Sequence, residues 1–195
     1  MQKRRYNMGR RAVAARETGL RIIEATLALY VDRWLEDLTL DDVAARAGVT
    51  VQTVLRRFGS KAELIRAAGE SLQQQVLSQR GQAPTGDIDG AVANLMEHYE
   101  ATGDLTLRTL AQEGRHDVLR DFAERGRAFH RAWVEATFAP CCEGLSAASG
   151  QRLINRLIVV TDLYTWKLLR RDMGLGRDEA QREIVEMAHA VIERT

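Results

Sequence analysis

The sequence is poor in the features that mark membrane, secreted or disulfide-bonded proteins. Proline occurs only at Pro84 and Pro140, and a chain that rarely needs a fixed φ angle is free to be mostly helical. The apolar stretch Leu157–Val160 is far short of the ~20 residues that span a bilayer. Three arginines between residues 10 and 16 interrupt the place where the apolar part of a secretory signal would lie. We therefore expect a cytoplasmic protein with no membrane partner.

Cysteine is also scarce, and its two copies, Cys141 and Cys142, are neighbours. Adjacent residues scarcely form an unstrained disulfide, because that geometry needs Cβ atoms that face each other. The pair fits a reducing compartment. Two interpretations stay open for it: ordinary thiols near a helix end, or a thiol or soft-metal sensor.

Motifs of catalysis are missing as well. We find no glycine-rich phosphate loop, no nucleophile elbow and no convincing cysteine–histidine pair. Glu97-His98 and Glu113 to His116 do not have the spacing of metal ligands. An enzyme is therefore a disfavoured alternative, and we expect no catalytic residue, no metal and no cofactor.

Charge is present in ordinary amount but is unevenly distributed. Hydrophobic residues make up 45% and charged residues 28% of the chain, which is typical of a folded protein. Residues 1–66 contain 13 basic and 8 acidic side chains, whereas residues 67–195 contain 15 and 19. A basic first third on an acidic remainder suggests a polyanion-binding domain joined to a domain with another task.

Apolar residues at helical spacing predict a first helix from about Arg11 to Trp34, preceded by a basic arm over residues 1–10. The predicted apolar stripe of this helix is Leu20, Ile23, Leu27, Val31 and Trp34. Two short helices follow. Thr39 is a good N-cap for the first and Gly48 ends it, while Thr50 caps the second and Gly59 ends that one.

Ser60 and Glu63 form a capping box, which predicts a fourth helix that reaches Arg80. A loop with Pro84 follows over residues 81–86. Further helices are expected at about 87–102, 105–113, 117–141, 149–172 and 177–195. No segment alternates convincingly with the two-residue period of a strand, so the chain is predicted to be all-α with about nine helices.

The two short helices have the length and turn of a helix-turn-helix, in which the second helix must protrude to enter a major groove. Val54 and Phe58 lie four residues apart and are expected to pack inward, while Gln52, Thr53 and Arg56 fall on roughly the opposite face. Gln can pair with adenine and Arg with guanine or phosphate. The alternative is that the arginines only form a solvated helix face.

The segment "LTLDDVAARAGVTVQTVLRRFGSKAEL" (Leu38–Leu64), within residues 11–66, resembles the DNA-binding domain of the TetR family of transcriptional repressors. Less specifically, "TWKLLRRDMGLGRDEAQREI" (Thr165–Ile184) is similar to the end of the helix pair that forms the dimer interface in many members. The resemblance implies a DNA-binding domain over residues 11–59 and a larger helical domain over 60–195 for effector binding and dimerisation.

The resemblance also implies that positions 50, 53, 55, 56 and 61 commonly touch DNA. The chain departs from the family where Leu55 and Arg57 stand at positions that are often aromatic, and where Gln52 replaces a frequent glycine. The full set expected to contact DNA is Thr39, Thr50, Val51, Gln52, Thr53, Leu55, Arg56, Arg57, Lys61, Arg10 and Arg11. For the two arginines of the arm, a solvated tail is the alternative.

The dimer and the effector are expected in the larger domain. The segment 149–172 is apolar on more than one face, so one face is free for a partner chain; a purely intramolecular core is the alternative. The expected interface residues are Leu153, Leu157, Val160, Tyr164, Leu168, Ile184, Ala188 and Val191. The candidates for a pocket that holds a small, apolar effector are Met96, His98, Tyr99, Phe122, Phe129, His130 and Trp133. A stripe of this kind is also typical of an ordinary core.

Together these features predict a homodimeric regulator that binds a palindromic operator in double-stranded DNA and is released by a small molecule. The resemblance favours a repressor. An activator, or a regulator without a ligand, is the alternative.

Overall fold

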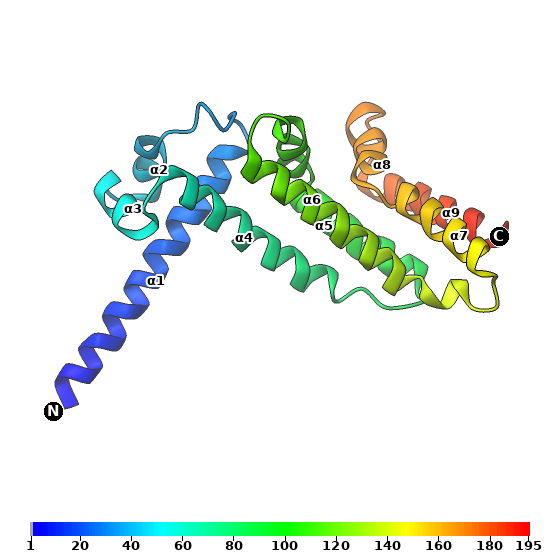
Figure 1. The fold of residues 1–195 in the computed structure, drawn as a ribbon, viewed down its shortest axis with the longest axis horizontal. Coiled ribbons are helices and arrows are strands. Elements are labelled where there is room, and N and C mark those ends of the chain that lie inside the picture. Colours follow the sequence, from blue (N-terminus) through cyan, green and yellow to red (C-terminus); the bar gives the residue numbers. More distant parts are fainter. Residues whose placement is uncertain (1) are drawn as a thin grey trace. The chain divides into compact units, whose positions relative to one another are not determined.

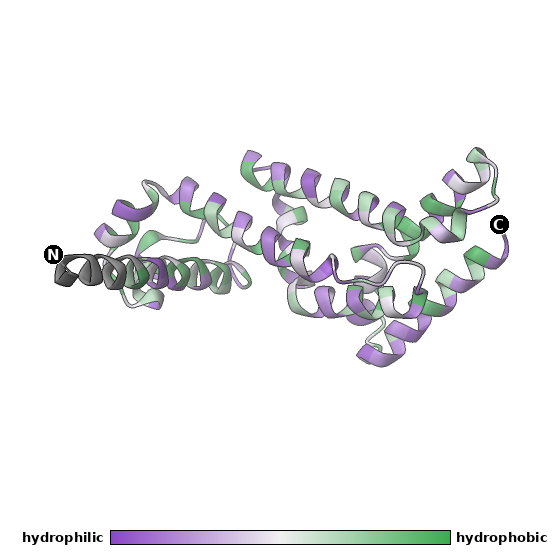
Figure 2. Cartoon of the chain, turned by 90° about the horizontal axis from the view of Figure 1, so that it is seen from below, coloured by the Kyte–Doolittle hydropathy of each residue, from purple (hydrophilic) through white to green (hydrophobic). Residues whose placement is uncertain are grey.

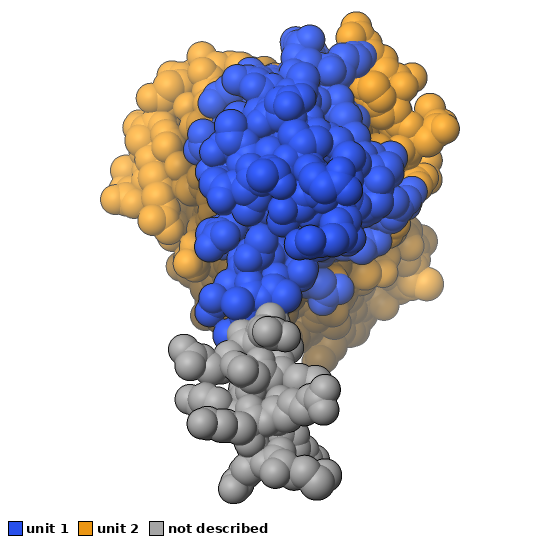
Figure 3. All heavy atoms as spheres, turned by 90° about the vertical axis from the view of Figure 1, so that its left-hand side faces the viewer, with its two compact units in different colours: residues 1–74 blue, residues 75–195 orange. Residues whose placement is uncertain are grey.

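The computed structural model describes the backbone of residues 2–195 and the side chains of residues 13–195 (Figure 1). The described residues form helices and no strand, as the sequence predicts. The chain divides into two compact units, residues 1–74 and 75–195, which we call the head and the body (Figure 3). The boundary falls inside a helix, whereas the sequence suggested a division after Gly59.

The head begins with three helices, and its fourth helix continues into the body. Their bounds are α1 Gln2–Tyr30, α2 Leu40–Ala47, α3 Val51–Phe58 and α4 Lys61–Arg80. The helix α2 packs against both α1 and α3. The fully buried side chains of the head include Ile22, Leu38, Val43, Val54 and Leu64. These residues form the small apolar core that fixes the direction of α3.

The stripe predicted for the first helix is wrong. Leu20, Val31 and Trp34 are exposed, and the helix ends at Tyr30 before the last two of them. The buried face is one residue position away from the predicted one, and it consists of Ile22, Ala25, Thr26 and Tyr30. The spacing of large apolar residues does not reveal this face, because Ala25 is small and Thr26 is polar. Thr26 is accommodated because its hydroxyl donates to the Ile22 carbonyl at 2.8 Å.

The caps predicted at Thr39 and Thr50, and the Ser60 half of the predicted capping box, are confirmed. The Thr39 and Thr50 hydroxyls accept from the Asp42 and Thr53 amides at 3.1 and 3.2 Å. Ser60 Oγ accepts from the Glu63 amide at 3.1 Å at the start of α4, which reaches Arg80 as expected.

The body consists of helices of very different length, which show both hydrophobic and hydrophilic residues (Figure 2). They are α5 Ile88–Gln112, α6 Asp117–Thr137, a 3₁₀ turn Ala139–Cys142, α7 Ala147–Val160, α8 Leu163–Lys167, a π-helical turn Leu168–Asp172 and α9 Arg177–Glu193. The helix α5 packs against α6, α8 and α9, and α7 packs against α6 and α9. The core between them includes Leu95, Phe138, Leu157, Trp166 and Ile184.

Two predicted boundaries in the body are wrong. A break was expected at Gly103-Asp104, but α5 continues through both residues. Gly103 does not end the helix; it leaves room for the Trp166 ring, since a Cβ at this position would lie 2.5 Å from that ring. The single helix expected over 149–172 ends instead at Val160. The Thr161 hydroxyl donates to the Leu157 carbonyl at 2.6 Å, and the Asp162 carboxylate then caps α8.

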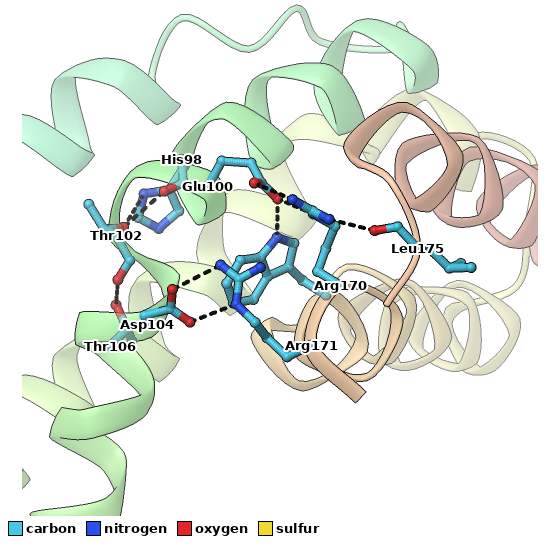
Figure 4. A network of polar contacts seen from close by, with 9 residues as sticks. His98, Glu100, Thr102, Asp104, Thr106, Arg170, Arg171 and Leu175 are labelled. Carbon is cyan, nitrogen blue, oxygen red and sulfur yellow. Dashed lines mark hydrogen bonds and ion pairs between the residues drawn. The ribbon is translucent and has the colours of Figure 1, made fainter. Parts of the chain in front are cut away.

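A network of ion pairs ties α5 to the segment after α7 (Figure 4). Arg170 forms a bidentate pair with Glu100 at 2.6 and 2.9 Å, and Trp166 donates to the same carboxylate at 2.8 Å. Arg171 forms a second bidentate pair with Asp104, one turn further along α5. The Arg170 side chain holds the pKa of Glu100 at about 2. No helix within the described residues is long and apolar enough to cross a membrane.

Candidate nucleic-acid interface

The turn between α2 and α3 is set by one glycine and one threonine. Gly48 has φ 66°, in the left-handed region, and the Val49 amide donates back to the Ala44 carbonyl at 2.9 Å. Thr50 then caps α3 immediately. The chain therefore reverses in three residues, which is the geometry that a helix-turn-helix needs.

The orientation of α3 follows from its inward residue. Val54 is fully buried and Phe58 half-buried, while Gln52 and Arg56 are exposed on the other side. Thr53 is half-buried, and its hydroxyl lies 3.0 Å from that of Thr50. The predicted orientation of these three outward residues matches the structure. Their contact with DNA stays a prediction.

Val51 and Leu55 flank this face and are half-buried. They leave methyl groups beside the polar residues rather than hydrogen-bonding groups. Leu55 has no hydroxyl to offer to a phosphate, so the DNA contact predicted for it would be apolar, such as one with a thymine methyl group.

Two residues of the expected DNA-binding set have structural partners that the sequence did not reveal. The Thr39 hydroxyl donates to the Asp42 carboxylate at 2.6 Å, and Arg33 pairs with the same carboxylate at 2.8 Å. These two hydrogen bonds, that of Thr39 first, lower the pKa of Asp42. Lys61 Nζ donates to the carbonyls of Leu35 and Glu36 at 2.8 and 3.3 Å. Lys61 therefore fastens the loop before α2 with two of its three N–H groups.

Arg57 points away from the outward face of α3. A Cβ on Gly19 of α1 would lie 2.2 Å from Arg57 Nε, so the guanidinium rests where a side chain of α1 would otherwise be. Its Cζ is also 6.0 Å from the centre of the Phe58 ring. Arg57 therefore packs against α1 although it is exposed, and its contact with DNA stays a prediction. Arg10 and Arg11 lie outside the residues whose side chains the structure describes.

The expected effector residues converge on an arginine that the sequence did not single out. Arg80, the last residue of α4, lies 3.9 Å from the Trp133 ring centre and 5.6 Å from that of Phe129. Its Nη2 is 3.3 Å from His130 Nδ1. The His98 and Tyr99 rings lie 5.1 Å apart beside it. Only the buried position of an arginine distinguishes this site, and a linear sequence carries no signal for that.

For the other two residues of the expected pocket, Met96 and Phe122, the assignment stays a prediction. Met96 is fully buried in the core of the body. Phe122 lies under the Arg125 guanidinium, 4.7 Å from Cζ to the ring centre.

Five of the residues expected at a dimer interface are instead part of the body's own core. Leu153, Leu157, Val160, Ile184 and Ala188 are buried within the single chain, because α7 and α9 pack against each other. Side chains that are already buried cannot serve as a free surface. Val191 is half-buried and packs against the same core. Tyr164 and Leu168 remain exposed, together with Val159 and Met173, which the sequence analysis did not select.

The cysteines and the acidic residues form no evident reactive centre. Cys141 and Cys142 are both free and half-buried, and burial raises the pKa of the Cys141 thiol. A raised thiol pKa favours the interpretation as ordinary thiols. Among the described residues, no group of three His, Cys, Asp or Glu side chains has the arrangement of a metal site.

The fold and the face of α3 define a helix-turn-helix head followed by a separate helical body. A family model described as "Bacterial regulatory proteins, tetR family" matches residues 22–68. Two relatives from Pseudomonas putida are each 42% identical over 62 residues: the uncharacterized HTH-type transcriptional regulator TtgW and the HTH-type transcriptional regulator SrpR. The alignments cover 32% of this chain but only 46% and 29% of the two relatives, so less than half of each is matched.

Solved structures extend the likeness of the fold to the whole chain. A transcriptional regulator from Rhodococcus sp. Rha1 has a TM-score of 0.70 at 16% identity, covering 90% of this chain and 96% of that one. A TetR-family regulator from Streptomyces coelicolor has a TM-score of 0.66 at 15% identity, covering 92% and 88%. The head is therefore similar in sequence to the DNA-binding part of tetR-family regulatory proteins, and the described chain shares its fold with solved transcriptional regulators.

Proposed function

We propose that this protein is a sequence-specific DNA-binding regulator of transcription and that α3 is its recognition helix. The observation that carries the proposal is the orientation of α3. Val54 is fully buried, and this leaves Gln52 and Arg56 exposed on the opposite side. An exposed amide and an exposed guanidinium on a short protruding helix match the hydrogen-bonding groups of base edges in a major groove. The basic composition of residues 1–66 supports attraction to phosphate.

The test is the variant Arg56→Ala. We expect it to weaken binding to a selected duplex roughly 10- to 100-fold, since one good base or phosphate contact contributes about 1–3 kcal/mol. The free energy of unfolding should change by no more than about 0.5 kcal/mol, because the side chain is exposed. Arg182→Ala is the matched control, since Arg182 is an exposed arginine on α9. Equal DNA affinity of the Arg56 and Arg182 variants would contradict the assignment of α3.

A homodimer that binds a palindromic operator is the second part of the proposal. Val159 at the end of α7 and Tyr164, Leu168 and Met173 beyond it are each more than half exposed, which is costly for large apolar residues. A second copy of the chain covers such a surface under two-fold symmetry. Two recognition helices would then read half-sites ~34 Å apart. Sedimentation of Leu168→Glu should give a monomer with weakened operator binding, whereas Arg182→Ala should stay dimeric. A monomeric parent protein would contradict this part.

We further propose that the protein is a repressor released by an effector bound in the body. The helix α4 contains residues of both units, so a ligand at its C-terminal end has a covalent route to the head. An effector changes the equilibrium only if it binds the DNA-free state more tightly. Deletion of the gene should raise transcripts of the target gene. A fall in these transcripts would indicate an activator instead.

A further inference from the structure

Arg80 of the body is a buried cation, and no carboxylate of the described residues pairs with it. Only 2% of Arg80 is exposed to solvent. It lies at the end of α4, where its carbonyl accepts from Trp133 Nε1 at 3.2 Å and fixes the backbone. Burial lowers the pKa of Arg80 to about 10, so the guanidinium still carries its charge at neutral pH.

The surroundings of this charge compensate it only in part. Among the described residues, no carboxylate pairs with Arg80, and its Nε has no hydrogen-bond partner. Contact with the Trp133 and Phe129 rings provides cation–π attraction, which offsets only part of the cost of removing a charged group from water. An arginine in this setting is short of one negatively charged acceptor.

The two histidines beside Arg80 do not supply that negative charge, and they do not add positive charge either. The guanidinium only donates, so His130 Nδ1 must accept from it. The ring proton is then on Nε2, which is 3.3 Å from the Thr161 hydroxyl and 3.4 Å from the Ile158 carbonyl. Burial, and next the charge of Arg80, hold the pKa of His98 at about 3 and that of His130 at about 4. The group therefore carries one positive charge at neutral pH.

The other side chains beside Arg80 are mostly rings, and they are mainly apolar. Trp133 and His130 are stacked with ring centres 6.0 Å apart, and Phe129 lies on the same helix. Tyr99 of α5 forms a side-chain hydrogen bond with Arg80, and its own hydroxyl donates to the Thr161 carbonyl at 3.0 Å. A guanidinium group surrounded by rings suits a ligand that has one anionic group and is otherwise flat or apolar.

We propose that Arg80 anchors a binding site in the body for a small monocarboxylate with an aromatic or cycloaliphatic ring. The carboxylate accepts from Nε and one Nη of Arg80 in the two-pronged geometry that guanidinium groups favour. The ring of the ligand lies against Phe129 and Trp133. This inference rests on the proposed effector function and gives that effector a chemical class.

The first experiment uses benzoate and cyclohexanecarboxylate as probes with the full-length protein. Their neutral controls are benzamide and cyclohexanecarboxamide, and sodium chloride at equal ionic strength controls for salt. A carboxylate present at a hundredfold excess over its Kd should raise Tm by roughly 5–10 °C. The amides should leave Tm nearly unchanged. Equal shifts by an acid and its amide would overturn the proposal.

Two variants locate the effect. In Arg80→Gln the shift by the carboxylates should disappear, whereas the exposed control Arg182→Gln should respond like the parent protein. Arg80→Lys keeps the charge but loses the planar fork, so its affinity should fall about tenfold. An Arg80→Gln protein that still responds to the carboxylates would exclude this site.

A second measurement does not depend on the folding of the Arg80 variants. Trp133 is in contact with the guanidinium, so carboxylate binding should change the tryptophan fluorescence of the parent protein. The change should be lost in Trp133→Phe and kept in Trp34→Phe, since Trp34 is an exposed residue of the head. A change that persists in Trp133→Phe would overturn the proposal.

DNA titrations separate this inference from the proposed function. If the carboxylates bind but operator affinity is unchanged, the site at Arg80 stands and release by an effector fails. If the parent protein prefers no duplex, DNA recognition fails independently of the carboxylate result.

Discussion

The head and the body of this protein are stabilised by interactions that differ in how far apart their partners lie in the sequence. In the head, Thr39, Gly48, Thr50 and Gly59 set the ends of α2 and α3, and the hydrogen bonds of the two threonines join atoms no more than three residues apart. In the body, Trp166 pairs with Glu100, and the Arg80 charge meets rings from α6. Local rules therefore describe the ends of α2 and α3, while the contacts of the body depend on partners that are distant in sequence.

The largest effect expected from this comparison is that of Trp166→Ala in the body. Trp166 is fully buried, fills the space above Gly103 and donates to Glu100. Its truncation should lower the free energy of unfolding by about 3–5 kcal/mol. Urea unfolding followed by circular dichroism measures this change. A loss below about 1 kcal/mol would mean that the long-range contacts of the body contribute little.

A smaller effect is expected for Gly103→Ala. Alanine is the better helix former, but here its Cβ would lie 2.5 Å from the Trp166 ring. Overpacking should dominate, with a loss of about 1–3 kcal/mol. Gly126→Ala is the matched control, because Gly126 on α6 has open space around it and should gain up to about 1 kcal/mol. Thermal unfolding of both variants is the measurement: Gly103→Ala should lower Tm and Gly126→Ala should raise it, and the opposite order would contradict the prediction.

In the head, Thr39→Ala should cost about 1 kcal/mol, because the Asp42 amide loses its acceptor at the start of α2. Thr18→Ala offers a control within α1, since the Thr18 hydroxyl bonds only to the Ala14 carbonyl of its own helix. That change should be neutral or slightly stabilising. If the two variants had equal stability in thermal unfolding, the local cap would not stabilise the head.

The smallest effect on stability at neutral pH is expected from histidine, and this effect distinguishes the body from the head. Residues 1–74 contain no histidine, whereas His98 and His130 of the body have a lowered pKa. Between about pH 6.5 and 4 the unfolded chain takes up protons that the folded body does not. The free energy of unfolding of the body therefore decreases as the pH is lowered. Fluorescence of Trp133 and Trp166 should show a lower urea midpoint at pH 5 than at pH 7. A constant midpoint would contradict buried, neutral histidines.

The sequence predicted the head almost to the residue for α2, α3 and their caps, because a cap needs only a polar side chain and a nearby amide. It failed for the buried face of α1, where Ala25 and Thr26 replace large apolar residues. Among the candidate site residues, the outward orientation of Gln52 and Arg56 followed from helical periodicity. The packing of Arg57 on Gly19 did not, because it depends on how α1 and α3 cross.

In the body, the existence of helices was predictable and their contacts were not. Apolar periodicity identified α7 and α9, but periodicity alone does not say whether an apolar face meets its own chain or a partner. Leu153 and Ile184 were thus assigned to a surface although they belong to the core. Gly103 shows the same difficulty, since a glycine in a sequence suggests a helix end until its neighbour in space is known.

The pairing of Gly103 with Trp166 also constrains how the body can diverge. The missing side chain on α5 and the large ring after α7 occupy one shared volume, so a change at either position alone leaves a clash or a hole. Substitutions at the two positions should therefore be tolerated mainly in combination. A mutant library of the body would need to vary both positions together, or to leave both unchanged.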